Sequence, residues 1–181
     1  MGPVRLSGRA WSDRPAGYSP RGRARRRTQP DPHGDAAIDP DPHHRSDGFN
    51  GAKLALFVGS DLLVYRRDDK PGLAWAGCWD LPGGGREGLE APFECVSREL
   101  FEEFGLALPA RRLVYSKAYG AAPEIRWFFA ARVERSFLED ISFGPEGQYW
   151  ARMTPGDFLR AKDAPLPLQD RLRDCMAELR R

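Results

Sequence analysis

The sequence predicts an α/β fold in which a β-sheet is flanked by two helices. Short apolar runs bounded by turn residues, which are typical of strands, occur at several places after residue 50. Two other segments, 91–104 and 168–179, repeat their apolar residues every three or four positions, which is typical of amphipathic helices. We therefore expect one folded α/β domain over residues 51–181.

The first fifty residues differ sharply in composition from the rest. They contain nine Arg, no Lys, seven Pro and six Gly. Such a segment buries too little apolar surface to offset the entropy of ordering, so residues 1–50 are predicted to be a disordered tail. Its Arg run, residues 23–27, could contact nucleic acid or act in targeting. The alternative is a solvated tail or an over-long translation start.

The first half of the domain is predicted to contain a hairpin followed by a bent segment. Residues 53–58 and 62–67 are apolar runs around the turn residues 59–61. Residues 68–78 are rich in turn formers and include Trp75. Leu81-Pro82 is expected to end a short strand, because proline cannot continue a ladder and three glycines then bend the chain.

The second half is predicted to add two paired strands and a short third one. Residues 111–119 and 125–133 are expected to pair, and the second of them is dense in aromatic residues. Residues 148–153 form a further short strand by the same criteria. Thr154 is expected to cap a turn of helix that ends at Leu159.

The helix at 91–104 has an apolar side and an acidic side. Its apolar side is made by Phe93, Val96, Leu100 and Phe104. Glu99, Glu102 and Glu103 fall on the opposite side, where residues three and four apart are neighbours. Gly105 is expected to cap the C-terminus. These carboxylates should converge and repel one another, so a cation must balance them.

A divalent metal ion suits this acidic cluster. Mg²⁺ and Mn²⁺ prefer carboxylate and carbonyl oxygens, and the glycine turn could add the main-chain carbonyl of Gly83. Arg98 could hold Glu90 in a bidentate pair and so fix the loop on the helix. The alternative interpretation is a solvated helix face, which is the usual meaning of charges opposite an apolar stripe. The glycines and the single arginine within the acidic run favour the metal site.

The spacing of these residues resembles the signature box of the Nudix hydrolases. The chain has Gly84, five residues, Glu90, seven residues, and then Arg98-Glu99-Leu100-Phe101-Glu102-Glu103-Phe104-Gly105-Leu106. The preceding segment, 79–84, resembles the lead-in of the MutT-like branch. The resemblance implies an α/β/α sandwich around a mixed β-sheet over residues 51–181. Glu146-Gly147-Gln148 resembles the late segment that supplies a further glutamate in that branch, although a simple hairpin turn at 144–147 is the alternative.

The resemblance also implies a reaction, a cofactor and a set of site residues. The reaction is hydrolysis of a nucleoside diphosphate linked to another group, with Mg²⁺ or Mn²⁺ activating water. The implied metal ligands are Gly83, Glu99, Glu102, Glu103 and Glu146. The four glutamates of this set are also the candidate catalytic residues, with the general base left open between Glu102 and Glu146. Glu90, Arg98 and Gly84 are assigned to orienting the ligands.

The substrate is less legible in the sequence. Trp75, Trp127 and Phe128 could stack a base and Arg66 could hold a phosphate, although core packing and solvated strand ends are the usual roles of such residues. Within the family a (deoxy)nucleoside triphosphate, cleaved to monophosphate and diphosphate, is the first expectation. MutT-like enzymes that favour oxidised guanine read the base through an asparagine, and the only asparagine here is Asn50, at the edge of the tail, so the resemblance does not extend to that preference. The alternatives are ADP-ribose or another sugar nucleotide, an RNA 5′ end, and a non-catalytic nucleotide sensor.

Composition excludes several other functions. All three histidines lie in the tail, so a Ser-His-Asp triad or a His-liganded zinc site is excluded within residues 51–181. The domain's 19 basic residues oppose 20 acidic ones, which disfavours duplex nucleic acid as a partner. No apolar run approaches a membrane span, and three unpaired cysteines suggest reduced thiols. We expect a cytoplasmic protein that acts on a small nucleotide, and the oligomeric state is left open.

Overall fold

The computed structural model describes residues 48–181. The prediction of disorder for residues 1–50 therefore lies outside the described part, except for its last three residues. The strands are β1 (Phe49–Val58), β2 (Asp61–Arg66), β3 (Trp79–Asp80), β4 (Leu113–Tyr119), β5 (Ile125–Val133) and β6 (Tyr149–Met153). The helices are α1 (Pro92–Phe104), α2 (Pro155–Arg160) and α3 (Leu166–Glu178), with 3₁₀ turns at Ala110–Arg112 and Arg135–Leu138. Strand β1 begins at Phe49, two residues before the predicted start of the domain.

The strands form one mixed sheet, as the sequence predicted. The order is β3-β2-β1-β5-β4, and β6 pairs with β2. Strands β1 and β5 run parallel along their whole length, whereas the other pairs are antiparallel. The predicted hairpin of β1 with β2 and the predicted pair of β4 with β5 are both confirmed.

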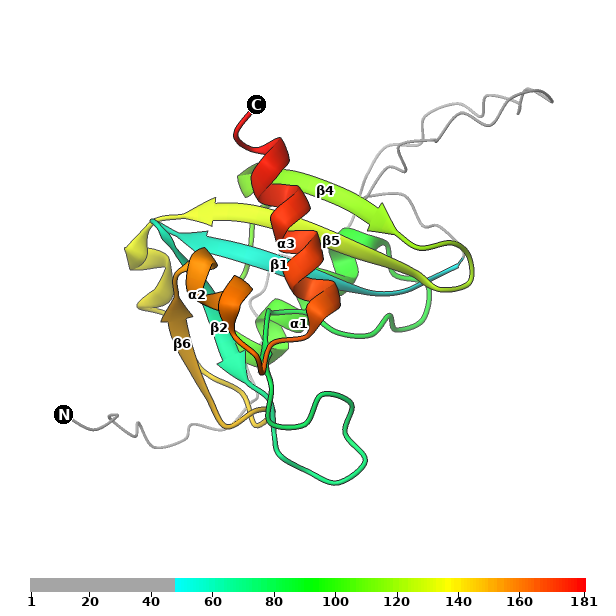
Figure 1. The fold of residues 1–181 in the computed structure, drawn as a ribbon, viewed down its shortest axis with the longest axis horizontal. Coiled ribbons are helices and arrows are strands. Elements are labelled where there is room, and N and C mark those ends of the chain that lie inside the picture. The colour runs from blue at the N-terminus through cyan, green and yellow to red at the C-terminus, as the bar shows by residue number, and fades with distance from the viewer. Residues whose placement is uncertain (1–47) are drawn as a thin grey trace. The chain divides into compact units, whose positions relative to one another are not determined.

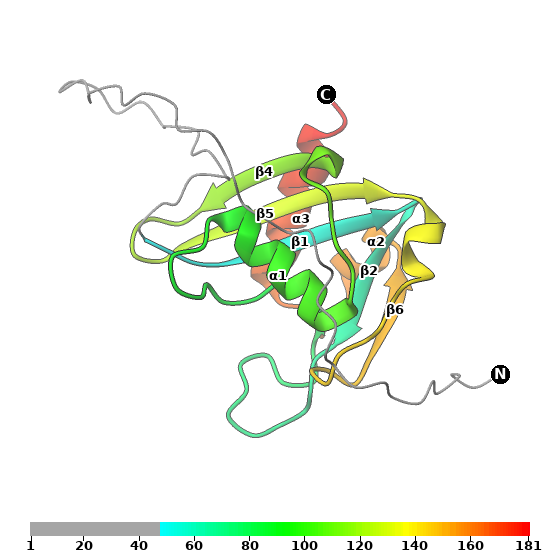
Figure 2. The ribbon, with the colours of Figure 1, turned by 180° about the vertical axis from the view of Figure 1, so that it is seen from behind.

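Helices cover both faces of the sheet, which gives the predicted α/β/α layers. Helices α2 and α3 lie in front of the sheet in Figure 1, and α1 covers the opposite face in Figure 2. The apolar side of α1 packs into one buried cluster with Leu54, Leu56 and Phe129 of the sheet. Leu168, Leu172 and Cys175 of α3 pack into a second cluster with Phe128. Within residues 48–181, no helix combines the length and apolar character needed to cross a bilayer.

Strands β1 and β2 pair only beside the turn that joins them, and their separation beyond it leaves room for the glycine turn. The two strands pair only at Phe57 with Leu62 and at Val58 with Asp61. Farther along, β2 pairs with β3 instead. The chain after β3 then crosses to β1, where the Leu54 amide donates a 2.8 Å hydrogen bond to the Pro82 carbonyl.

Candidate active site

The glycine turn lies along the open edge of β1. The Ala52 amide donates to the Gly84 carbonyl at 3.0 Å. Gly83 has a φ of +119°, and a Cβ atom there would fall well inside contact distance of the Ala52 carbonyl. A Cβ atom on Gly84 would lie 2.5 Å from Glu99 Oε1. Glycine is therefore required here because backbone and carboxylate both approach too closely for a side chain.

Helix α1 is fixed at both of its ends. Pro92 occupies the first turn, and the Glu94 carboxylate accepts a 2.9 Å hydrogen bond from the Ala91 amide. At the other end Gly105 adopts the left-handed conformation with a φ of 70°, and its amide donates to the Phe101 carbonyl at 2.8 Å. The predicted helix and its glycine cap are confirmed, and the acidic residues between the two ends hold fixed positions.

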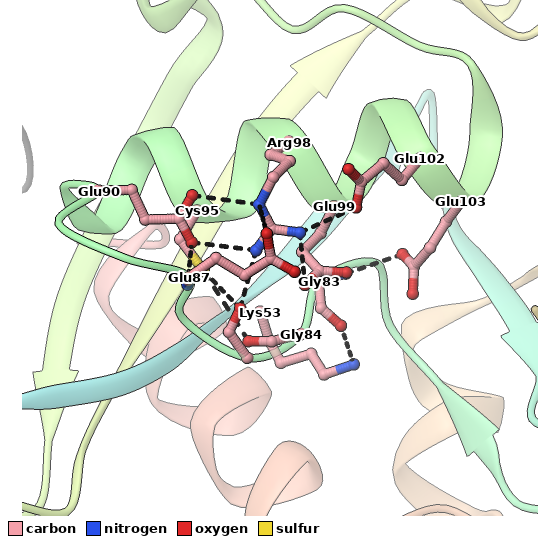
Figure 3. A network of polar contacts seen from close by, with 11 residues as sticks. Lys53, Gly83, Gly84, Glu87, Glu90, Cys95, Arg98, Glu99, Glu102 and Glu103 are labelled. Atoms are coloured by element: carbon pink, nitrogen blue, oxygen red, sulfur yellow. Dashed lines mark hydrogen bonds and ion pairs between the residues drawn. The ribbon is translucent and has the colours of Figure 1, made fainter.

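Arg98 is the centre of the acidic cluster (Figure 3). Its Nε and Nη2 atoms donate to the two Glu90 oxygens at 3.1 and 3.0 Å, which is the bidentate pair expected from the sequence. Its Nη1 atom lies 3.0 Å from Glu99 Oε1 and donates to Glu102 Oε2 at 2.8 Å. Its Nη2 atom also donates to the Gly85 carbonyl at 2.8 Å. Burial favours the neutral form of Glu90, but the hydrogen bonds from Arg98 and the Glu87 amide, together with the Arg98 charge, outweigh burial and lower the pKa of Glu90.

Glu103 is the buried member of the cluster, with 4% of its surface exposed. Its Oε2 atom accepts a 2.9 Å hydrogen bond from the Gly83 amide. Burial raises the pKa of this carboxyl to about 8, although the Lys53 charge and the Gly83 hydrogen bond oppose the rise. On the other side of the same glycine, the Lys53 ammonium donates to the Gly83 carbonyl. Gly83 thus connects a buried carboxylate with a cation (Figure 3).

The three helix carboxylates do not meet at a single point, contrary to the expected convergence. Glu99 and Glu102 turn towards Arg98, whereas Glu103 turns towards Gly83. In the part of the chain that the structure describes, no three Cys, His, Asp or Glu side chains are close enough to ligate one ion. The helical spacing was predicted correctly. The Arg98 guanidinium, however, balances Glu99 and Glu102, and Glu103 is buried against the glycine turn.

A second ionic group stands beside the glycine turn. Asp80 is 3% exposed and accepts hydrogen bonds from Lys53 at 2.9 Å and from Arg67 at 2.8 Å. The Tyr65 hydroxyl donates to the same oxygen at 3.4 Å. Burial raises the pKa of Tyr65, so this hydroxyl remains a donor. Lys53 reaches both Asp80 and Gly83 and therefore links the two ionic groups.

A cavity of about 330 Å³ opens next to the glycine turn. Its walls come from β1, β5, the start of α3 and the segment after β2. Trp75, whose φ is +57°, forms part of the wall and is 56% exposed. The polar lining residues are Lys53, Arg67, Asp80, Arg126 and Arg171. The volume falls within the range of small-molecule sites.

The remaining predicted site residues are distributed differently from expectation. Trp75 and Trp127 line the cavity, but Trp127 is 1% exposed and stacks on a core aromatic ring. Phe128 is fully buried in the core, which favours the packing alternative. Arg66 pairs with Asp163 and lies over the Trp79 ring, outside the cavity lining.

Glu146 lies in the loop before β6 and is exposed. Gly144, two residues earlier, donates from its amide to the Glu103 carbonyl at 2.8 Å, which ties this loop to the end of α1. Among the described residues, no hydrogen bond or ion pair joins Glu146 to the three helix carboxylates. Its place as a ligand or general base stays a prediction.

Several residues of the site were not identified from the sequence. Lys53 and Asp80 left a weak signal, because each is a charge within an otherwise apolar strand segment. Arg126 precedes the aromatic run of β5, and Arg171 lies between Leu168 and Leu172 of α3. Their positions resemble ordinary strand-end and helix-surface charges, and only the tertiary fold brings them to one cavity.

Comparison with known proteins shows the family to which this architecture belongs. The profile of the NUDIX domain matches residues 51–174. Among solved structures, the MutT protein from Methanosarcina mazei Go1 is similar over 75% of this chain and 98% of its own, with 18% identity and a TM-score of 0.59.

Two further solved structures are similar to the same extent. An Ap4A hydrolase from C. elegans, solved as a binary complex, has 20% identity and a TM-score of 0.55, covering 71% of this chain and 97% of its own. The ORF135 protein of E. coli has 21% identity and a TM-score of 0.55, covering 72% of this chain and 91% of its own. At these identities the likeness concerns the fold.

Proposed function

Because the chain belongs to the NUDIX domain family, whose members act on phosphoric anhydride bonds, we propose that it is a divalent-metal-dependent nucleotide pyrophosphohydrolase. The proposed reaction converts a (deoxy)nucleoside triphosphate to the monophosphate and diphosphate. The observation that carries the proposal is the contact of Glu99 and Glu103 with one glycine turn, directly beside a cavity of nucleoside size. Mg²⁺ or Mn²⁺ is the proposed cofactor.

The residues around Gly83 suit such an ion. The Gly83 carbonyl already accepts a hydrogen bond from a cationic group, the Lys53 ammonium. The buried carboxyl of Glu103, whose pKa is raised, lies on the other side of the same residue. Glu99 lies against Gly84, in space that a side chain would fill. Two carboxylates and one carbonyl are enough for Mg²⁺, which commonly keeps several waters and takes the rest of its shell from substrate phosphates.

In this proposal Glu99, Glu103 and the Gly83 carbonyl hold the ion. When bound, the ion neutralises charge on the phosphates and makes water more acidic. Arg98 keeps Glu90 and Glu99 in place and attaches the helix to the loop through the Gly85 carbonyl. The chain's own residues thus set the position of the ligands before any substrate arrives.

The proton of the attacking water is assigned to Glu102. Its side chain is 49% exposed, more than that of Glu99, so an entering water can reach it. It accepts a hydrogen bond from Arg98 Nη1 at 2.8 Å, which orients the carboxylate. Glu146, in the exposed loop before β6, is the competing candidate for the same proton.

The nucleoside is assigned to the cavity. Trp75 offers an accessible aromatic surface there, and stacking of a base on such a ring contributes about 1–3 kcal/mol. Arg67 reaches the same cavity and is held there by Asp80. A nucleotide in this position has its phosphates beside Gly84 and Gly85, which also line the cavity.

A nucleotide panel tests the proposed function. The full-length protein is incubated with the common nucleoside triphosphates, ADP-ribose, Ap4A and 5′-triphosphate RNA, each with Mg²⁺ and with EDTA. We expect Mg²⁺-dependent release of monophosphate and diphosphate from at least one nucleoside triphosphate. Turnover confined to ADP-ribose or RNA would reassign the substrate, and an absence of turnover on the whole panel would contradict the proposal.

A further inference from the structure

The cavity beside the glycine turn carries an excess of positive charge. Four of its lining side chains are cationic and one, Asp80, is acidic. Lys53 and Arg67 both donate to that single aspartate. Arg126 and Arg171, on the wall formed by β5 and α3, are therefore left without a strong partner in the cavity.

Arg126 is only weakly balanced. Its guanidinium leans over Gly51, with Nη1 3.3 Å from the point that a Cβ atom of that glycine would occupy. Glu124 lies 3.9 Å away, at the limit of an ion pair. That carboxylate is 73% exposed and accepts a 3.0 Å hydrogen bond from Asn50 instead.

The positive charge of Arg171 is balanced even less than that of Arg126. Its guanidinium lies 5.3 Å from the centre of the Tyr119 ring, and within residues 48–181 it forms no ion pair with a carboxylate. Burial and repulsion from Arg126 lower its pKa, so the two guanidinium groups are close enough to act on each other. Arg173, on the exposed side of the same helix, has a normal partner in Asp170 at 2.5 Å.

Two half-buried guanidinium groups that repel each other in one cavity are stabilised by an anion placed between them. The planar fork of arginine matches phosphate oxygens in a bidentate manner, which distinguishes it from a simple point charge. The backbone of this wall lies away from the glycine turn, while the Arg126 guanidinium reaches back over Gly51 towards the Gly84 carbonyl. Arg126 is in register with Gly51 of β1, which bridges Gly85, so two strand spacings or about 10 Å separate its backbone from the turn.

We propose that Arg126 and Arg171 form a second phosphate-binding subsite, which selects nucleotides carrying a phosphate on the sugar in addition to the pyrophosphate chain. The inference rests on the proposed function for the orientation of the nucleotide, with its pyrophosphate at the glycine turn and its sugar in the cavity. The cleaved bond is the same. The subsite changes which nucleotide is preferred.

Binding of uncleavable mononucleotides tests this subsite without metal. Isothermal titration calorimetry in EDTA and about 0.15 M salt, where long-range attraction is screened, compares AMP with adenosine 3′,5′-bisphosphate and adenosine 2′,5′-bisphosphate. We expect one bisphosphate to bind about tenfold more tightly than AMP, equivalent to about 1.4 kcal/mol. Arg126→Gln and Arg171→Gln should each remove this preference and leave the affinity for AMP nearly unchanged.

Arg173→Gln is the matched control, because it removes the same charge from the same helix outside the cavity. It should keep the preference, and circular dichroism should show all three variants folded. Bisphosphates that bind no more tightly than AMP, or a preference that survives Arg171→Gln, would overturn the subsite. GMP is included because arginine can also bind the O6 and N7 atoms of guanine. A preference for GMP over AMP that Arg171→Gln abolishes would assign the pair to base recognition and overturn the proposal.

The outcome is separable from that of the proposed function. Preferential binding of a bisphosphate without hydrolysis of any nucleotide in Mg²⁺ would sustain the subsite and contradict the enzymatic proposal. Hydrolysis of a nucleoside triphosphate without that preference would do the reverse. Where both hold, a nucleoside 5′-triphosphate with an added phosphate at the preferred sugar position should show a higher kcat/KM than the plain triphosphate.

Discussion

The acidic cluster on α1 and the cavity beside the start of α3 differ in how far their charged side chains are paired. In the cluster, the single guanidinium of Arg98 contacts Glu90, Glu99 and Glu102 at 2.8–3.1 Å. In the cavity, Arg126 and Arg171 line the same wall and repel each other, and within residues 48–181 the nearest ion-pair partner of either is Glu124, 3.9 Å from Arg126. The charges of the cluster are balanced within the protein, whereas the positive charges of the cavity are not.

The difference separates groups that hold the fold from groups that await a ligand. Charges inside a complete network fix side-chain positions, and their removal leaves buried partners unpaired. Charges without partners cost stability in the free protein and regain it when a ligand binds. Substitutions should therefore reduce stability mainly in the cluster, and ligand affinity mainly in the cavity.

The largest effect is expected for catalysis after Glu102→Gln. Loss of a positioned proton acceptor typically lowers turnover by about 10²–10⁴-fold. The fold should persist, because the side chain is 49% exposed. Turnover of the best nucleotide from the panel in Mg²⁺ gives the measurement. Glu178→Gln, which alters an equally exposed carboxylate paired with Lys117, should leave turnover unchanged. Normal activity of Glu102→Gln, with loss in Glu146→Gln, would transfer the role of base.

Arg98→Ala should cause the next largest effect, on stability. The change leaves Glu90 and Glu99, whose side chains are 13% and 15% exposed, without their counter-charge. Removal of one partner from a buried pair costs about 3–5 kcal/mol, and the 21% exposure of Arg98 reduces the expected loss to about 2–3 kcal/mol. Urea unfolding provides the free energy.

Two further variants sharpen the interpretation of Arg98. Arg173→Ala breaks an exposed pair and should cost less than about 1 kcal/mol. Arg98→Lys restores the charge without the planar fork, so it should recover only part of the stability. Equal losses for Arg98→Ala and Arg173→Ala would show that the cluster is no more coupled than the surface.

A smaller effect is expected in the pH dependence of stability without metal. Burial raises the pKa of Glu103 from 4.5 to about 8, so between these values the folded state binds more protons than the unfolded state. Stability must then fall as the pH rises through this window. Melting temperatures in EDTA from pH 5 to pH 8 should decline in the wild type and decline less in Glu103→Gln. Parallel curves for the two proteins would contradict the assignment of this proton to Glu103.

Local elements were the most predictable part of the fold. The hairpin, helix α1 and its Gly105 cap are determined by residues close in the sequence, and each was found as predicted. The family resemblance gave the mixed sheet, but the pairing of β2 with β6 joins distant segments and has no local signature. Strand β4 begins later than predicted because residues 110–112 form a 3₁₀ turn after Pro109.

In the candidate site, too, contacts between residues of one motif were predictable and contacts that depend on the tertiary fold were not. The Arg98–Glu90 pair was predictable because both residues belong to one motif with fixed spacing. The different directions of Glu99 and Glu103 were not, because they depend on how the glycine turn lies on the helix. Arg126 and Arg171 belong to no motif and come to line one cavity only because α3 packs against the sheet.

The smallest effect on stability is expected for Arg171→Gln. Its guanidinium has no carboxylate partner within the described residues, and it lies near Arg126. The substitution removes a contact with the Tyr119 ring, which contributes about 0.5–1 kcal/mol, and also removes the repulsion and the cost of burial. These opposing changes should leave the free energy of unfolding in urea within about 0.5 kcal/mol of the wild type. A loss comparable to that of Arg98→Ala would show that Arg171 is part of the structural network, and the contrast between the two regions would fail.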